Sequence, residues 1–211
     1  MWSIFDARTI VTLLALLMAM CTGVVGLLLL SRRPTPAASE WGCSMLIFVV
    51  SSMFLLIRQP GFNWWPLNIG IALAVLTCML ALRGIQRWNG HPNPSWIPTI
   101  TAPLLTLLFL NFARITDLPN SYQAAISPGF TGAILGYCVY EAWFKPGLKV
   151  ATQVLLFLTL LQALRTVLYV APIDPIYPVM SALVLSGAVT VAAIVFYRIV
   201  AQRTEALHER C

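Results

Sequence analysis

The chain has 211 residues, of which 59% are hydrophobic and only 9% are charged, and its mean hydropathy is +0.84. This composition lies far outside the range of soluble globular proteins and indicates an integral membrane protein. The net charge of +6 does not indicate nucleic-acid binding, because the basic residues stand singly or in pairs at the ends of apolar runs instead of forming a stripe.

The apolar runs have the length of membrane helices and predict an all-α polytopic bundle with seven transmembrane helices. In chain order, the expected spans are about 10–30, 41–57, 64–82, 96–113, 122–144, 150–170 and 176–200. The segments SRRPTPAASE and RGIQRWNGHPNPS are expected to be loops after the first and third spans. We expect a transmembrane domain over residues 1–200 and a cytoplasmic connector or tail over residues 201–211.

The basic residues also predict the orientation of the chain. One side of the predicted bundle collects Arg32, Arg33, Arg83, Arg87, Lys145, Lys149, Arg198, Arg203 and Arg210. The other side has only Arg8, Arg58, Arg114 and Arg165. Because cytoplasmic loops carry the excess of Lys and Arg, we expect the N-terminus outside and the C-terminus in the cytoplasm. The expected location is the inner membrane of a bacterium.

Several classes of site lack their necessary residues. A retinal Schiff base needs a lysine within the bundle, but Lys145 and Lys149 fall in a predicted loop. A membrane haem usually needs histidines inside the membrane, but His91 and His208 lie outside the spans, and there is no HExxH sequence. The cysteines have no metal-binding spacing. We therefore expect no cofactor, no metal site and no enzymatic activity in this chain.

The sixth predicted span contains LLQALRTVLYV, which places Arg165 and Gln162 on one polar stripe of a helix. A charge within a membrane span is costly and usually faces the bundle interior. At a similar depth the topology places Asn68 and Asn111, with Asp117 and Asp174 in the flanking outer loops. We predict a ligand-binding site formed by Arg165, Gln162, Asn68, Asn111, Asp117 and Asp174.

Two other interpretations of Arg165 remain open. It could form a clasp with Asp174 or with Asp117 that fixes the loops to the bundle, since arginine pairs bidentately with carboxylates. It could also reach toward lipid headgroups. The one acid expected within a span, Glu141, is predicted to pair with Arg83, Lys145 or Lys149.

The segment WWPLNIGIALAVLTCMLALRGIQRWNG resembles the N-terminal membrane domain of bacterial GGDEF-type diguanylate cyclases. In those domains an asparagine opens an apolar helix that ends in a Gly-Ile/Leu-x-x-aromatic turn before a small polar loop. Here those positions are Asn68, Gly84 and Trp88. The resemblance implies a seven-helix sensory domain that passes a signal to a cytoplasmic output domain. The chain contains no GG[DE]EF loop, so the resemblance implies the sensory and anchoring part alone, either as a fragment or as a shortened paralogue.

Our expectation is therefore a membrane sensor that couples an outer-face or membrane signal to a cytoplasmic signalling partner. The expected partners are lipid, that cytoplasmic protein or domain, and a second copy, because Val200, Leu207 and Cys211 hint at a heptad seam for a homodimer. The alternatives are a small transporter, with Pro98, Pro103 and Pro128 as hinges, or an inert membrane scaffold.

Overall fold

The computed structural model describes residues 7–31, 35–56, 64–118, 120–170 and 176–208, and all the regular structure within them is helical. These residues form seven long helices, which are α1 (Ala7–Ser31), α2 (Pro36–Leu56), α3 (Trp64–Trp88), α4 (Ile97–Ile115), α5 (Asn120–Trp143), α6 (Lys149–Val170) and α7 (Ile176–His208). A short 3-10 helix, η1 (Pro146–Leu148), precedes α6.

Six of the seven helices are long and apolar enough to cross a membrane, so the all-α, multi-pass class expected from the composition is confirmed. The exception is α5, whose sequence NSYQAAISPGFTGAILGYCVYEAW mixes small, polar and acidic residues with apolar ones. This helix contacts α3, α4 and α6, so much of its surface faces protein. Crossing by α5, the fifth of the expected spans, stays a prediction, and so does the total of seven spans.

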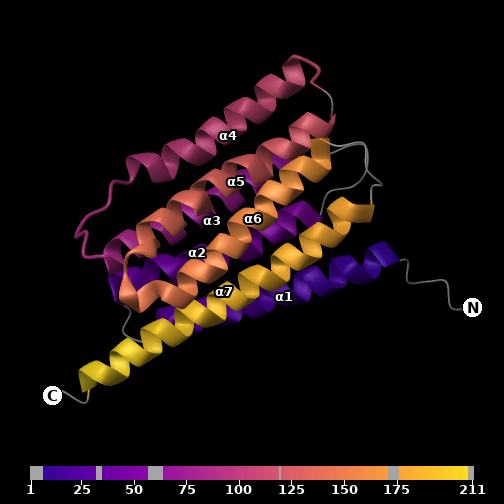
Figure 1. Cartoon of the computed structure of the whole chain (residues 1–211). Coiled ribbons are helices and arrows are strands. Elements are labelled where there is room, and N and C mark those ends of the chain that lie inside the picture. Colours follow the sequence, from indigo (N-terminus) through magenta and orange to yellow (C-terminus); the bar gives the residue numbers. More distant parts are fainter. Residues whose placement is uncertain (1–6, 32–34, 57–63, 119, 171–175, 209–211) are drawn as a thin grey trace, which may run out of the picture.

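The helices form a ring with one helix outside it. Going round the ring, α1 packs on α2, α2 on α3, α3 on α5, α5 on α6, α6 on α7, and α7 returns to α1. Helix α4 is left out of this circuit and packs on α3 and, over a shorter stretch, on α5. Figure 1 shows α4 set apart along one edge of the bundle. It also shows that α1 begins and α7 ends at opposite ends of the bundle.

Hydroxyl and indole groups connect neighbouring helices where the hydrophobic effect supplies little force between them. From α2, Ser44 and Ser51 donate hydrogen bonds to backbone carbonyls of α3 at Thr77 (2.8 Å) and Gly70 (2.7 Å). Between α1 and α7, the hydroxyls of Thr22 and Thr190 lie 3.1 Å apart. Within a bilayer, polar side chains of this kind are a main source of helix association.

Helices α2 and α3 extend into segments that were expected to be loops. Helix α2 starts at Pro36 instead of Trp41 because Thr35 caps it, accepting the Ala38 N–H with its side chain (3.3 Å), and proline suits the first helical position. Helix α3 continues six residues past the expected end, through Arg87 to Trp88. Much of both expected loops is therefore helix. As a result, Glu40 lies on α2, and Arg83 and Arg87 lie on α3.

The expected boundary at residue 200 is not a structural break. Helix α7 continues to His208, so most of the predicted tail, residues 201–211, extends the last membrane helix. In Figure 1 this end of α7 projects beyond the other helices. The heptad contacts expected of Leu207 and Cys211 lie outside the side chains that the structure describes.

At Gly84, helix α3 packs directly against the Trp41 side chain of α2. A Cβ atom on Gly84 would lie well inside van der Waals contact with the indole Nε1 of Trp41. Trp41 cannot move aside easily, because it is only 1% exposed and its ring packs on Phe196 with a centroid distance of 4.5 Å. Only glycine therefore fits at position 84.

We predict that Gly84→Ala destabilises the fold by about 1–3 kcal/mol, the usual cost of overpacking a core. The measurement is the free energy of unfolding in detergent micelles. The matched control is Gly129→Ala in α5, where an added Cβ meets nothing within 4 Å and alanine raises helix propensity. Equal stability of the two variants would contradict the close contact.

Candidate functional site

The centre of the helix ring contains a cavity of about 110 Å³. Its walls come from α2, α3, α5, α6 and α7, and are mostly apolar. On the α7 side the lining residues are Leu185, Val189, Ala192, Ala193 and Phe196. Apolar cavities of about this size stay dry and bind small apolar molecules, so this cavity is suited to such a ligand.

The hydroxyls in the cavity wall already donate their protons to the backbone. Ser44 bonds to the Thr77 carbonyl, Thr77 to that of Leu73, and Thr131 to that of Ser127, at 2.8–2.9 Å. The remaining polar group in the wall is the amide of Gln162, which is 5% exposed. The cavity therefore offers one side-chain amide for recognition within an otherwise apolar surface.

Arg165 controls the orientation of that amide. Its Nη1 donates to the Gln162 Oε1 at 3.1 Å, and its Nη2 lies 3.5 Å from the Tyr169 hydroxyl. A guanidinium group can only donate, so the amide oxygen of Gln162 must face Arg165 and its NH2 group must face elsewhere. The expected association of Gln162 with Arg165 is thus present, and Arg165 acts on the cavity through Gln162.

The other predicted site residues do not join this pair. Asn68 is buried in α3, and Asn111 bonds back to the Leu107 carbonyl of its own helix (2.9 Å). Asp117 is exposed beyond the end of α4 and has a positive φ of 49°. Both Asn111 and Asp117 depend on α4, which lies outside the ring, whereas Arg165 is on α6. Asp174 lies outside the described residues.

The ion pairs expected of Arg165 and Glu141 can be compared with the ion pairs that the described residues form. Both ion pairs between described side chains use Glu40 as the acid. A pair between Arg165 and Asp117 is therefore not formed, and the alternative with Asp174 cannot be placed. The expected ion pair of Glu141 is wrong for the same reason, since Arg83 pairs with Glu40 and neither lysine is paired.

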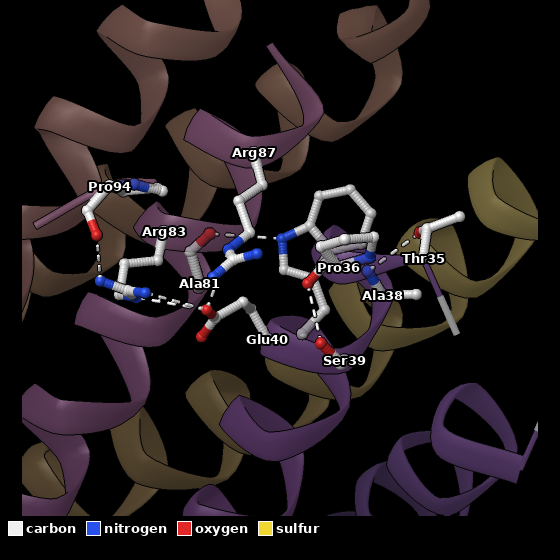
Figure 2. A network of polar contacts seen from close by, with 10 residues as sticks. Thr35, Pro36, Ala38, Ser39, Glu40, Ala81, Arg83, Arg87 and Pro94 are labelled. Carbon is white, nitrogen blue, oxygen red and sulfur yellow. Dashed lines mark hydrogen bonds and ion pairs between the residues drawn. The ribbon is translucent and has the colours of Figure 1, made fainter. Parts of the chain in front are cut away.

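The bundle does contain a buried charge cluster, which comprises Glu40, Arg83 and Arg87 and was not expected from the sequence. Figure 2 shows both arginines turned toward the carboxylate. Nε and Nη2 of Arg83 donate to Glu40 Oε1 at 3.3 and 3.2 Å. Nε of Arg87 lies 3.1 Å from the same oxygen but makes no hydrogen bond.

Arg83 is only 1% exposed, and it makes two contacts besides those with Glu40. Its Nη1 donates to the Pro94 carbonyl at 2.6 Å, and its guanidinium carbon lies 3.6 Å from the centre of the Trp96 ring. The loop before α4 thus closes over the cluster. With two arginines and one carboxylate, the cluster keeps a surplus positive charge.

Local signals in the sequence could have located this cluster. Thr35 followed by Pro36 is a helix-start pattern, and it places Glu40 in the second turn of a helix. Arg83 and Arg87 are four residues apart and share one face if the third helix continues. Hydropathy alone misses this arrangement, because charged residues lower the average and end the predicted spans too early.

Trp41 connects the charge cluster with the central cavity. It follows Glu40 in the chain, lines the cavity, and donates its indole N–H to the Ala81 carbonyl at 3.2 Å. Its ring packs on Trp88 of α3 and Phe196 of α7, with centroid distances of 5.5 and 4.5 Å. The cluster and α7 therefore both contact the same short stretch of α2.

The described residues contain no cluster of typical metal ligands. Within them, no three His, Cys, Asp or Glu side chains come together as metal ligands. Cys21, Cys43, Cys78 and Cys138 are free thiols.

We predict that Glu40→Gln destabilises the protein by about 3–5 kcal/mol, because removal of one partner leaves buried charge uncompensated. The free energy of unfolding in detergent is again the measurement. The control is Asp117→Asn, which removes an exposed carboxylate and should change stability little. The double variant Glu40→Gln with Arg83→Met should recover part of the loss. A Glu40→Gln protein as stable as the parent would show that the cluster contributes nothing.

Arg165→Met should change the free energy of unfolding by no more than about 1 kcal/mol. Its two hydrogen bonds, at 3.1 and 3.5 Å, stabilise the fold modestly. Its Nε is buried without a partner, which destabilises the fold by a similar amount, so the two contributions nearly cancel. Arg83→Met, measured in parallel, should cost several times more. A large loss in Arg165→Met that Asp174→Asn recovers would instead demonstrate a clasp.

Comparisons of the chain with protein-family models, with curated proteins and with solved structures found no match. The central cavity and the charge cluster are therefore the features of this chain that bear on its function.

Proposed function

We propose that this chain is a membrane sensory domain in which a small apolar molecule occupies the central cavity and α7 passes the change to a cytoplasmic partner. The observation that supports this most directly is that α7 lines the cavity and also extends past the rest of the bundle. One continuous helix thus joins a ligand-sized internal space to an exposed end.

The chemistry of the cavity defines the class of ligand. Its apolar wall favours a molecule with a hydrocarbon or halocarbon body, and the volume of about 110 Å³ limits that body to a few heavy atoms. The Gln162 amide, oriented by Arg165, can donate one hydrogen bond to a polar atom of the ligand. A small apolar molecule with a single acceptor fits best.

The route to α7 runs through aromatic contacts. Phe196 lines the cavity and packs on Trp41, which is itself fixed to α3 by a hydrogen bond. A ligand that presses on Phe196 therefore moves α7 against a fixed neighbour. Relay requires two arrangements of α7 that bind the ligand with different affinity.

The resemblance to the membrane domains of GGDEF-type cyclases supports the same assignment, because those domains pass signals to a cytoplasmic enzyme. Under this proposal the end of the bundle with Glu40 and the end of α7 faces the cytoplasm, as the distribution of basic residues predicts. The membrane would be the bacterial inner membrane. The signalling partner, either another protein or a second copy of the chain, would contact the projecting end of α7.

Xenon is a suitable probe, since it enters dry apolar cavities. We expect xenon to bind the purified protein in nanodiscs and to change amide hydrogen exchange in the end of α7, residues 198–208, severalfold. Ala192→Leu fills the cavity from α7 and should remove both effects. Ala163→Leu adds the same atoms to an exposed position of α6 and should behave like the parent protein.

Each alternative result has a definite meaning. Xenon binding without any change in the exchange of α7 would refute the relay, and a protein that does not bind xenon would refute the cavity as a ligand site. Uptake of a small solute into proteoliposomes that is lost in Ala192→Leu would favour the transporter. If xenon binding, the change in α7 and solute transport were all absent, the inert membrane scaffold would be the remaining interpretation.

A further inference from the structure

A second cavity lies outside the helix ring, between α3, α4 and α5, and has a volume of about 510 Å³. This volume falls within the range of roughly 300–1,000 Å³ typical of ligand sites. One part of its wall is apolar, with Met79, Leu82, Ala102, Leu105 and Ile134. The other part is polar and includes Arg83, Gln86, Ser95, Thr99 and Tyr137. The cavity is thus amphiphilic, and it is distinct from the central cavity.

Thr99 is the unusual residue in this wall. It is 1% exposed, and its hydroxyl is buried without a hydrogen-bond partner. Every other threonine side chain that the structure describes has a hydrogen bond; within α4, for instance, Thr101 and Thr106 bond back to Ile97 and Ala102 at 2.9 Å. A buried polar group without a partner costs stability, so the site lacks a polar atom that a ligand could provide.

The backbone at Thr99 is also incompletely bonded. In an α-helix its carbonyl would accept from the N–H of residue 103, but residue 103 is proline and has no N–H. Thr99, a residue of the cavity wall, therefore has both a hydroxyl without a partner and a carbonyl without its usual N–H partner. Both groups lie close to the beginning of α4, where the helix dipole favours negative charge.

The surroundings determine which occupant fits. Helix α4 exposes a long apolar surface, with Ile97, Leu104, Leu108 and Phe112 all more than half exposed, so hydrocarbon chains surround it in a membrane. At the polar part of the wall the charge cluster of Arg83, Arg87 and Glu40 has a surplus positive charge. The apolar side of the cavity matches the acyl chains of an anionic lipid. The other side, with its positive charge and free hydrogen-bonding groups, matches the headgroup.

We propose that this cavity binds one anionic phospholipid, with an acyl chain between α4 and α5 and the headgroup beside Thr99 and Arg83. The ester or phosphate oxygens accept from the Thr99 hydroxyl, and the surplus charge of the cluster favours the anionic headgroup. Because α4 lies outside the ring, a lipid can enter between α4 and α5 without disturbing the ring itself. This site is independent of the proposed signal-receiving cavity.

The test is native mass spectrometry of the protein released from nanodiscs that contain equal amounts of phosphatidylglycerol and phosphatidylcholine. We expect one retained phosphatidylglycerol per chain. Thr99→Val keeps the side-chain shape, removes the hydroxyl and should lower retention about tenfold, which corresponds to about 1.4 kcal/mol. Ala133→Phe, at an exposed position of the cavity wall, should abolish retention by filling the acyl-chain space.

The control is Thr106→Val, which removes a buried hydroxyl from the same helix at a position outside the cavity wall. It should retain lipid like the parent protein, and thermal unfolding of each variant checks that it is folded. Equal retention of both lipids would overturn the anionic assignment. Stabilisation by inorganic phosphate without lipid retention would show a phosphate site, and dimers without lipid would show that a second copy covers α4; either result would overturn the proposal.

Discussion

The arrangement of this bundle depends on one buried interaction, the contact of Glu40 with Arg83 and Arg87. Buried charges are tolerated only when they are paired and hydrogen-bonded, so the start of α2 and the end of α3 must stay in one register. Arg83 also binds the Pro94 carbonyl and stacks on Trp96, which fixes the loop that leads into α4. The guanidinium group of Arg83 therefore also helps to set where α4 starts outside the ring.

This constraint extends to the centre of the molecule through the next residue of α2. Glu40 belongs to the charge cluster, and Trp41 lines the central cavity and packs on Phe196 of α7. The absence of a side chain at Gly84 allows the indole to lie directly against α3. A cavity that borders this rigid contact on one side and α7 on the other can direct a change of packing to α7, because the α2–α3 side resists movement.

Much of the fold could be predicted from the sequence, since apolar runs of membrane length identify helices without any knowledge of their packing. The ends were less predictable, because Glu40, Arg83 and Arg87 lower the local hydropathy although they lie on helices. Gln162 and Arg165 were correctly associated, since residues three apart on a helix are neighbours. The grouping of Asn111 and Asp117 with them failed because similar depth in a membrane says nothing about position around the ring, and α4 is outside it.

The exclusion of α4 from the ring has a further structural consequence. A helix within the ring buries its polar atoms against partners on two sides, whereas α4 has α3 on one side and only a short contact with α5 on the other. Its prolines remove backbone donors along the same helix. Near the start of α4, the Thr99 hydroxyl is buried without a partner. In a membrane the groups available to complete such a surface are those of the surrounding lipid, so under the lipid-binding proposal the lipid is part of the packing of α4, as α3 is.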